Sequence, residues 1–209
     1  MNRGYGPAWL APLTGALFFL LLIVSFLVMG EPKDAEDPVE DIVGFYVDNK
    51  DEVQIGAFIG VLAGLLLMSF GAYLRSFLRA ATGEDSITPT LAFAGTVIVA
   101  IAIAIDGTIS FALAESADNI DPSGVQALQA LWDNDFVPFI LGATAYLLGT
   151  GLAILRSGAL PRWLGWVMVI ALIAGFTPIG WAAAIVAGLS VLVISVMLTM
   201  GARGAPSAG

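Results

Sequence analysis

Apolar residues along this chain of 209 residues gather into six long runs that are separated by short polar segments. A helix needs about 20 mostly apolar residues to cross the hydrocarbon core of a bilayer. The pattern therefore predicts an all-α fold, a polytopic membrane helix bundle with six transmembrane helices. The predicted spans lie at about residues 8–29, 53–74, 89–114, 136–155, 163–176 and 181–200. Residues 177–180 (Thr-Pro-Ile-Gly) divide the last two spans, because Pro and Gly together interrupt helices.

The two longest polar loops carry a second apolar pattern. In each loop an Asp-Pro pair, Asp37-Pro38 or Asp121-Pro122, is followed by apolar residues at helical spacing. Asp is a favoured N-cap residue, Pro is favoured at the first helical position, and Glu40 would complete a capping box with Asp37. We predict two short amphipathic helices on the outer face, which either close the bundle or form a lid or docking surface. Their apolar sides include Ile42, Tyr46, Val47, Leu128, Leu131 and Trp132.

Composition supports a membrane domain and sets its extent. Hydrophobic residues make up 58% of the chain and charged residues 12%, whereas soluble domains carry roughly 25% charged residues. Six spans leave little sequence for anything else, so residues 1–200 are expected to form a single membrane domain. Residues 201–209 are expected to form a flexible C-terminal tail.

Charged residues are sorted between the two ends of the predicted spans. Fourteen of the 17 acidic residues lie in loops 30–52 and 115–135, and six of the eight basic residues lie on the other side. Arg and Lys favour the cytoplasmic side of short loops. We therefore expect a multi-pass protein of the cell (plasma) membrane, with cytoplasmic N- and C-termini and both acidic loops outside. A secretory signal peptide fits the first run less well, because its apolar core is long and no A-x-A site follows it.

Two missing residue types narrow the chemistry. The chain has no Cys and no His, which removes thiol chemistry, His-bound haem, His-containing zinc proteases and Ser–His catalysis. No catalytic motif is recognisable, so we expect no enzyme activity, no cofactor and no metal. The net charge of −9 is concentrated on the acidic side and disfavours nucleic acid there.

Asp106 is the ionisable residue that lies well inside a predicted span. Such a group costs about 2.5–3.5 kcal/mol at the bilayer centre and is often functional. No Lys, Arg or His lies at the same depth to pair with it. Candidate partners are Ser110 on the same helix face and, across helices, Tyr146, Thr144 or Trp181. Three interpretations stay open: a buried contact that fixes helix packing, a proton or cation site, and a contact with a partner.

The second span carries Gly56, Gly60 and Gly64, a double G-x-x-x-G pattern. Glycines four residues apart form a groove that another helix can approach closely. We interpret the groove as packing within the chain, with a homo-oligomer interface and a substrate groove as alternatives.

The two acidic loops also resemble each other. Residues 46–49 (Tyr-Val-Asp-Asn) match residues 131–134 (Leu-Trp-Asp-Asn), and each segment precedes a span that ends in Leu-Arg-Ser. Units repeated in the same orientation imply a pseudo-rotation about the membrane normal. A duplicated hairpin and a shared topology with coincidental matches both account for the pattern.

Three segments carry a resemblance to known proteins. They are residues 42–49 before the second span, residues 130–133 before the fourth, and residues 160–166 (Leu-Pro-Arg-Trp-Leu-Gly-Trp) at the start of the fifth. They resemble uncharacterised multi-pass membrane proteins of actinobacteria that are grouped under a domain of unknown function. The resemblance covers about residues 30–200. It implies a helical integral membrane bundle and no particular activity.

Two hypotheses for function follow. The first is an accessory or structural membrane protein that binds membrane lipids, another membrane protein or a second copy of itself. The alternative is a transporter or channel for a small solute or cation, with Asp106 as its ionisable site. A water-filled path to Asp106 would favour transport, whereas an apolar groove open to lipid would favour the accessory role.

Overall fold

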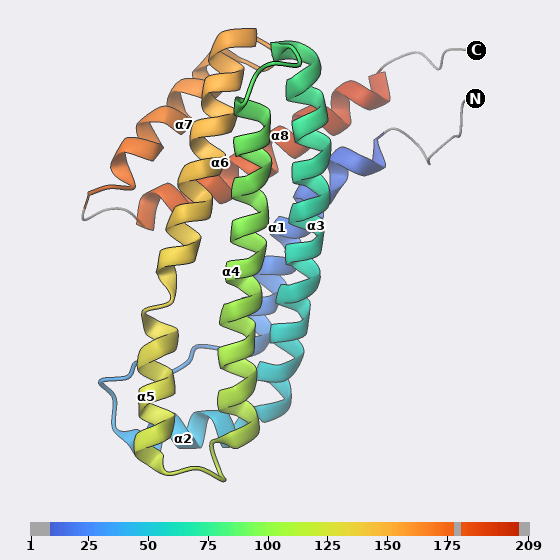
Figure 1. Ribbon diagram of the computed structural model, residues 1–209. Coiled ribbons are helices and arrows are strands. Elements are labelled where there is room, and N and C mark those ends of the chain that lie inside the picture. The colour runs from blue at the N-terminus through green and yellow to red at the C-terminus, as the bar shows by residue number, and fades with distance from the viewer. Residues whose placement is uncertain (1–8, 178–180, 205–209) are drawn as a thin grey trace.

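The computed structural model describes residues 9–177 and 181–204, and all regular structure in these residues is helical (Figure 1). The predicted break at 178–180, Arg3 and residues 205–209 lie outside the described residues, as do the side chains of Trp181 and Arg203. The helices are α1 (Leu10–Met29), α2 (Val39–Asp48), α3 (Lys50–Thr82), α4 (Thr88–Ser116), α5 (Pro122–Asp133), α6 (Phe136–Ser157), α7 (Arg162–Ala174) and α8 (Trp181–Gly204).

Helices α3 and α4 form a long antiparallel hairpin at the centre of the bundle (Figure 1). Helix α1 packs on α3 and α6 packs on α4, so the hairpin holds α1 and α6 apart. Helix α7 packs on α6, and α8 packs on both α1 and α7. Gly83 and Gly158 end α3 and α6 with positive φ angles of 92° and 67°, which glycine adopts at little cost.

Helices α1 and α8 are joined by a serine that bridges two backbone groups. The buried Ser195 hydroxyl accepts a hydrogen bond from the Ala16 N–H at 2.8 Å and donates one to the Pro12 carbonyl at 2.6 Å. Pro12 and Ala16 are four residues apart, which is the spacing of a helix's own backbone bond. Ser195 therefore fixes the beginning of α1 beside the second half of α8.

Five helical stretches are long and apolar enough to cross a membrane. They are Leu10–Met29, Lys50–Thr82, Thr88–Ser116, Pro122–Ser157 and Ala182–Gly201. Helix α7 has 13 residues, or about 20 Å of helix, which is short for a hydrocarbon core about 30 Å thick. The all-helical prediction is confirmed, and the fold is compatible with a multi-pass membrane protein. The count of six spans stays a prediction because of α7.

Helices α4 and α6 approach each other backbone to backbone. A methyl group built on Gly95 would lie 2.3 Å from the Tyr146 main-chain nitrogen. One built on Gly149 would lie 2.3 Å from the Ala92 nitrogen. Both distances are too short for a real Cβ, so the contact depends on glycine at these positions. This contact was not predicted from the sequence.

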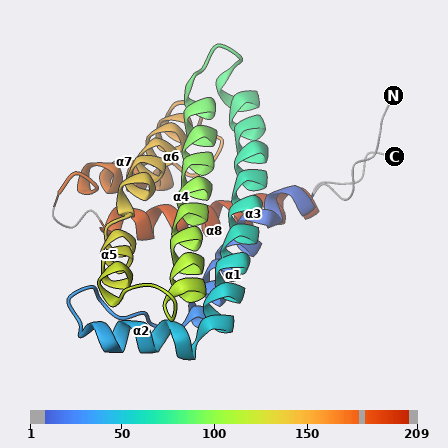
Figure 2. The same cartoon turned by 60° about the horizontal axis from the view of Figure 1, so that its bottom comes forward.

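Helices α2 and α5 lie at the end of the bundle opposite the Gly83 turn (Figure 2). We call residues 30–48 and 118–135 the cap. Helix α5 runs in nearly the same direction as α6 (Figure 1). Side chains predicted to be apolar contacts divide into two groups. Ile42, Tyr46 and Val125 are buried, with Leu128 and Trp132 packed against them, whereas Val47 and Leu131 are 45% and 53% exposed.

The two Asp-Pro pairs behave differently. Asp121 caps α5 as predicted, because its carboxylate accepts hydrogen bonds from the N–H of Ser123 at 2.9 Å and from the Ser123 hydroxyl. These bonds lower the pKa of Asp121 from its ordinary value. The predicted cap at Asp37 was wrong. Its carboxylate accepts from the Asp34 N–H at 3.0 Å in a preceding turn, and α2 begins at Val39 without a side-chain cap.

Candidate ligand cavity

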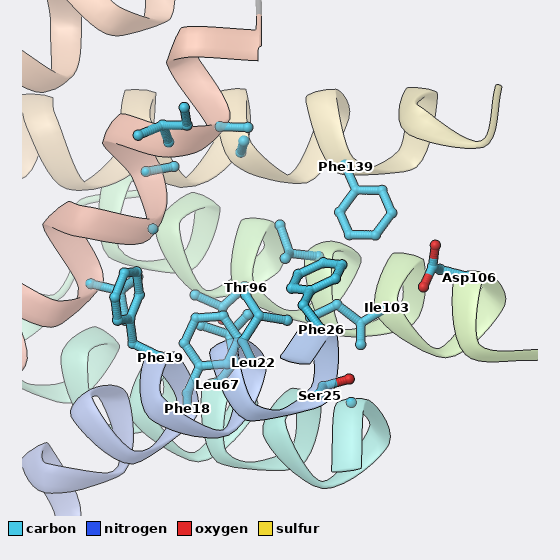
Figure 3. Close-up of a pocket in the computed structure, with 18 of the residues that line it drawn as sticks. Phe18, Phe19, Leu22, Ser25, Phe26, Leu67, Thr96, Ile103, Asp106 and Phe139 are labelled. Atoms are coloured by element: carbon cyan, nitrogen blue, oxygen red, sulfur yellow. The ribbon is translucent and has the colours of Figure 1, made fainter. Parts of the chain in front are cut away.

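A cavity of about 500 Å³ lies among α1, α3, α4, α6 and α8 (Figure 3). Its wall is made mainly of apolar side chains, among them Phe18, Phe19, Phe26 and Phe139. Four polar side chains also line it, namely Ser25, Thr96, Asp106 and Tyr146. The cavity is therefore an apolar space with a single ionisable group in its wall.

The cavity arises because α8 fills only part of the space between α1 and α6. Helix α8 meets α1 near the beginning of α1, where Ser195 bonds Pro12 and Gly188 lies next to Phe19. Wall residues nearer the cap are open on one side, since Phe26 is 57% exposed. Ile185 and Leu189 of α8, which also line the cavity, are 53% and 46% exposed. The cavity opens sideways, and in a bilayer this opening would face lipid.

Three of the four polar wall residues are satisfied within the protein. The hydroxyls of Ser25 and Thr96 each donate to a main-chain carbonyl at 2.7 Å. The Tyr146 hydroxyl accepts a hydrogen bond from Ser190 at 3.2 Å. Asp106 is left as the polar wall group whose carboxylate accepts no hydrogen bond of good geometry from the described residues.

The predicted partners of Asp106 bond elsewhere. The Ser110 hydroxyl donates to the main-chain carbonyl of Asp106 at 3.0 Å and not to its carboxylate. Tyr146 pairs with α8, and the Thr144 hydroxyl donates to carbonyls of its own helix. None of these three candidates bonds the carboxylate. Ser110 and Thr144 bond carbonyls three or four residues back, as Ser and Thr in helices do, and the Tyr146 hydroxyl is paired with Ser190. The side chain of Trp181, the other candidate, lies outside the described residues.

Two groups from the junction of α5 and α6 approach the Asp106 carboxylate instead. The Trp132 indole N–H faces it as a hydrogen-bond donor, and the Asp135 carboxylate repels it through its negative charge. The Trp132 N–H is buried without a well-formed hydrogen bond in the described part of the chain, as is one carboxylate oxygen of Asp135. Trp132 was predicted only as part of an apolar helix side. Asp106 and Trp132 are 26 positions apart in the sequence, and no sequence signal predicted their contact.

Asp106 stands at one end of the cavity, beside Phe26 and Phe139 (Figure 3). Phe19 lies toward the opposite end (Figure 3). Since Trp132 belongs to the cap, the Asp106 end is the end nearer the cap. The cavity thus has a direction, with a charged end at the cap and an apolar interior.

The glycines of the double G-x-x-x-G pattern face other helices of the same chain. Methyl groups added at Gly56 and Gly60 would meet α1 at Met29 and at Ser25. One added at Gly64 would meet Ala100 of α4 at 3.4 Å. The groove is thus filled within the chain, which leaves a homo-oligomer interface at these glycines without structural support.

Acidic groups near the cavity do not form a multidentate metal site in the described residues. No group of three or more His, Cys, Asp or Glu residues within 9–177 and 181–204 is placed to hold a metal ion. The arrangement can instead enclose an apolar chain and offer a carboxylate to a polar group at the end of that chain.

Comparison of the chain with protein-family models, with curated proteins and with solved structures gives no match. The fold and site define the class only as far as an all-helical protein with five membrane-compatible helices. The resemblance to the actinobacterial membrane proteins stays a prediction.

Proposed function

We propose that this chain is an integral membrane protein that binds the apolar chain of a lipid in the cavity between α1 and α6. One observation carries the proposal: the cavity measures about 500 Å³ and has an apolar wall, part of which is formed by the exposed residues Phe26, Ile185 and Leu189. This is the lipid-binding form of the accessory role that the sequence suggests.

The size of the cavity favours a lipid chain over a helix of a partner protein. Pockets that hold small ligands measure about 300–1,000 Å³. A transmembrane helix about 10 Å wide and about 30 Å long fills roughly 2,400 Å³. A partner helix would therefore need a groove several times larger than this cavity.

The polar groups of the cavity favour a lipid chain over a hydrophilic solute. A hydrated ion or polar solute needs polar partners along its path through the membrane. Ser25, Thr96 and Tyr146 already have hydrogen-bonding partners in the protein, and Asp106 lies at one end. Transport through Asp106 stays the alternative. A cation-dependent rise in thermal stability that Asp106→Asn abolishes would support it.

Native mass spectrometry of protein extracted in mild detergent tests lipid binding. We expect the wild type to retain one lipid per chain through detergent washing. Ala184→Trp puts a large ring into the cavity wall and should release the lipid. Val196→Trp is the matched control, because Val196 lies on the same helix, is 42% exposed and does not line the cavity. A wild type that retains no lipid, or that carries a stoichiometric partner protein instead, would overturn the proposal.

We also propose a plasma-membrane protein with six spans, cytoplasmic termini and the cap outside, on the strength of its arginine distribution. Because the chain has no Cys, single cysteines report sidedness directly. In intact cells, a membrane-impermeant maleimide should label Asp118→Cys in the cap and leave Glu84→Cys, in the α3–α4 turn, unlabelled. The reverse pattern would invert the orientation.

A further inference from the structure

We propose that the ligand of this cavity is an amphiphile with a cationic head, an amine or quaternary ammonium, which pairs with Asp106. The inference rests on the proposed function, in which an apolar chain fills the cavity. It adds the class of the head group and the direction of the ligand. The head lies at the cap end, and the chain extends toward Phe19 (Figure 3).

The first argument is the incomplete environment of Asp106. A carboxylate at membrane depth is stabilised by a cation or by several hydrogen-bond donors. The Ser110 hydroxyl is used on a main-chain carbonyl, and the Trp132 indole N–H, which faces the carboxylate, lies outside good hydrogen-bond geometry. The charged group that acts on Asp106 is Asp135, which is also an acid. A ligand cation would supply the charge that the described protein groups around Asp106 do not.

The second argument is the set of rings beside Asp106. Phe26 and Phe139 stand between Asp106 and the deeper part of the cavity (Figure 3). Aromatic faces attract ammonium groups within about 6 Å of the ring centre, and more strongly when water is excluded. An alkylammonium ion would therefore meet a carboxylate and two rings at one end and apolar walls along its chain.

The third argument is the charge of the cap, which lies at the Asp106 end of the cavity. The cap contributes most of the acidic residues of the chain, so its potential attracts cations and repels anions. An anionic head would be repelled by Asp106 and by the cap together. A neutral alcohol would gain a hydrogen bond at Asp106 without the charge attraction. Head-group charge is therefore the property on which the site should discriminate.

The test uses the full chain in nanodiscs of zwitterionic lipid and three radiolabelled probes with one hexadecyl chain. The probes are hexadecyltrimethylammonium, hexadecanol and hexadecyl sulfate, and empty nanodiscs give the background. We expect the wild type to retain the ammonium about tenfold more tightly than the alcohol, and the sulfate most weakly. Asp106→Asn should bind the alcohol as tightly as the wild type does. It should bind the ammonium no more tightly than it binds the alcohol. Glu52→Gln is the control, because it removes one exposed charge near the cap and should keep the preference.

Each outcome separates the head-group inference from the proposed function. If Asp106→Asn retains the alcohol and loses the preference for the ammonium, the result supports both the head-group inference and the proposed lipid binding. Retention of the alcohol also shows that the variant is folded. Equal retention of ammonium and alcohol by the wild type, abolished by Ala184→Trp, would overturn the head-group inference and leave lipid binding intact. An ammonium preference that survives Asp106→Asn would also overturn it. Retention of none of the probes by the wild type would overturn both.

Discussion

The cap and the cavity both keep polar side chains away from water, but they use them differently. In the cap, the Tyr46 hydroxyl donates to the Gln129 side-chain oxygen at 2.7 Å, and the Gln129 amide donates to Asp133 at 2.8 Å. Asp133 also accepts from the Ala35 N–H at 2.8 Å, so the chain of bonds joins α2, α5 and the segment before α2. In the cavity, Asp106 has no comparable chain. Polar groups of the cap hold the structure together, whereas Asp106 belongs to no such network of well-formed bonds.

Gln129→Leu should be the most damaging change in this comparison. Gln129 is fully buried, and its loss leaves the Tyr46 hydroxyl and one Asp133 oxygen without their partner. We expect a loss of about 2–4 kcal/mol in the free energy of unfolding, measured by SDS titration with circular dichroism. Gln54→Leu is the matched control, because Gln54 makes an exposed bond to Glu115, and it should cost less than about 0.5 kcal/mol. Equal losses in the free energy of unfolding for the two variants would show that the buried bonds of Gln129 stabilise the protein no more than an exposed bond does.

Removing one hydroxyl from each region makes a finer comparison. Tyr46→Phe leaves the buried Gln129 oxygen unpaired and should cost about 1–2 kcal/mol in the same titration. Tyr146→Phe in the cavity wall should cost less than about 0.5 kcal/mol, because Ser190 keeps its 2.7 Å bond to the Ala187 carbonyl. A larger loss in the free energy of unfolding for Tyr146→Phe than for Tyr46→Phe would show that the hydroxyl in the cavity wall stabilises the protein more than the one in the cap.

High pH should weaken the cap through the same tyrosine. Burial first, and then the Asp133 carboxylate, raise the pKa of Tyr46 above its ordinary value of 10.0. The neutral phenol therefore contributes stability that is complete below pH 10.0 and declines as the pH rises above it. The difference in melting temperature between the wild type and Tyr46→Phe should narrow from about pH 9 to about pH 11.5. A difference in melting temperature that stays constant over this range would argue against stabilisation of the cap by the neutral Tyr46 hydroxyl.

Asp106→Asn should have the smallest effect on the ligand-free protein. Its carboxylate accepts no hydrogen bond of good geometry from the described residues, so the free energy of unfolding should change by less than about 0.5 kcal/mol. Asp133→Asn, which disturbs bonds to Gln129 and Ala35, should cost about 1–2 kcal/mol under the same conditions. If the two variants lose equal stability, Asp106 is a structural group like those of the cap.

The helices could be predicted from the sequence because length and hydropathy determine which segments cross a bilayer. Short local signals were less dependable. The same Asp-Pro pair caps α5 at Asp121 and fails to cap α2, where a turn between Asp34 and Asp37 uses the carboxylate first. A local motif therefore shows which hydrogen bonds a side chain can form, and the conformation of the neighbouring residues determines which of them are present in the fold.

The cavity could not be predicted, although its charged residue was a candidate from the start. An acid inside an apolar run attracts attention because its charge is costly in lipid. Its neighbours Trp132 and Phe26 come from other helices, and their positions depend on how α1, α4 and α6 pack. The glycines at 95 and 149 that bring α4 and α6 together form no G-x-x-x-G pattern, so only the folded chain reveals their role.

The bond from Ser195 to Pro12 also has a consequence for the order of assembly. These residues are 183 positions apart, so α1 is synthesised long before its partner serine. Until then α1 has only α3 as an extensive helical neighbour among those described. The cavity, whose wall includes α8, forms only when this late helix docks. A nascent chain that lacks α8 therefore lacks part of the cavity wall, and the proposed ligand would enter only after α8 has docked.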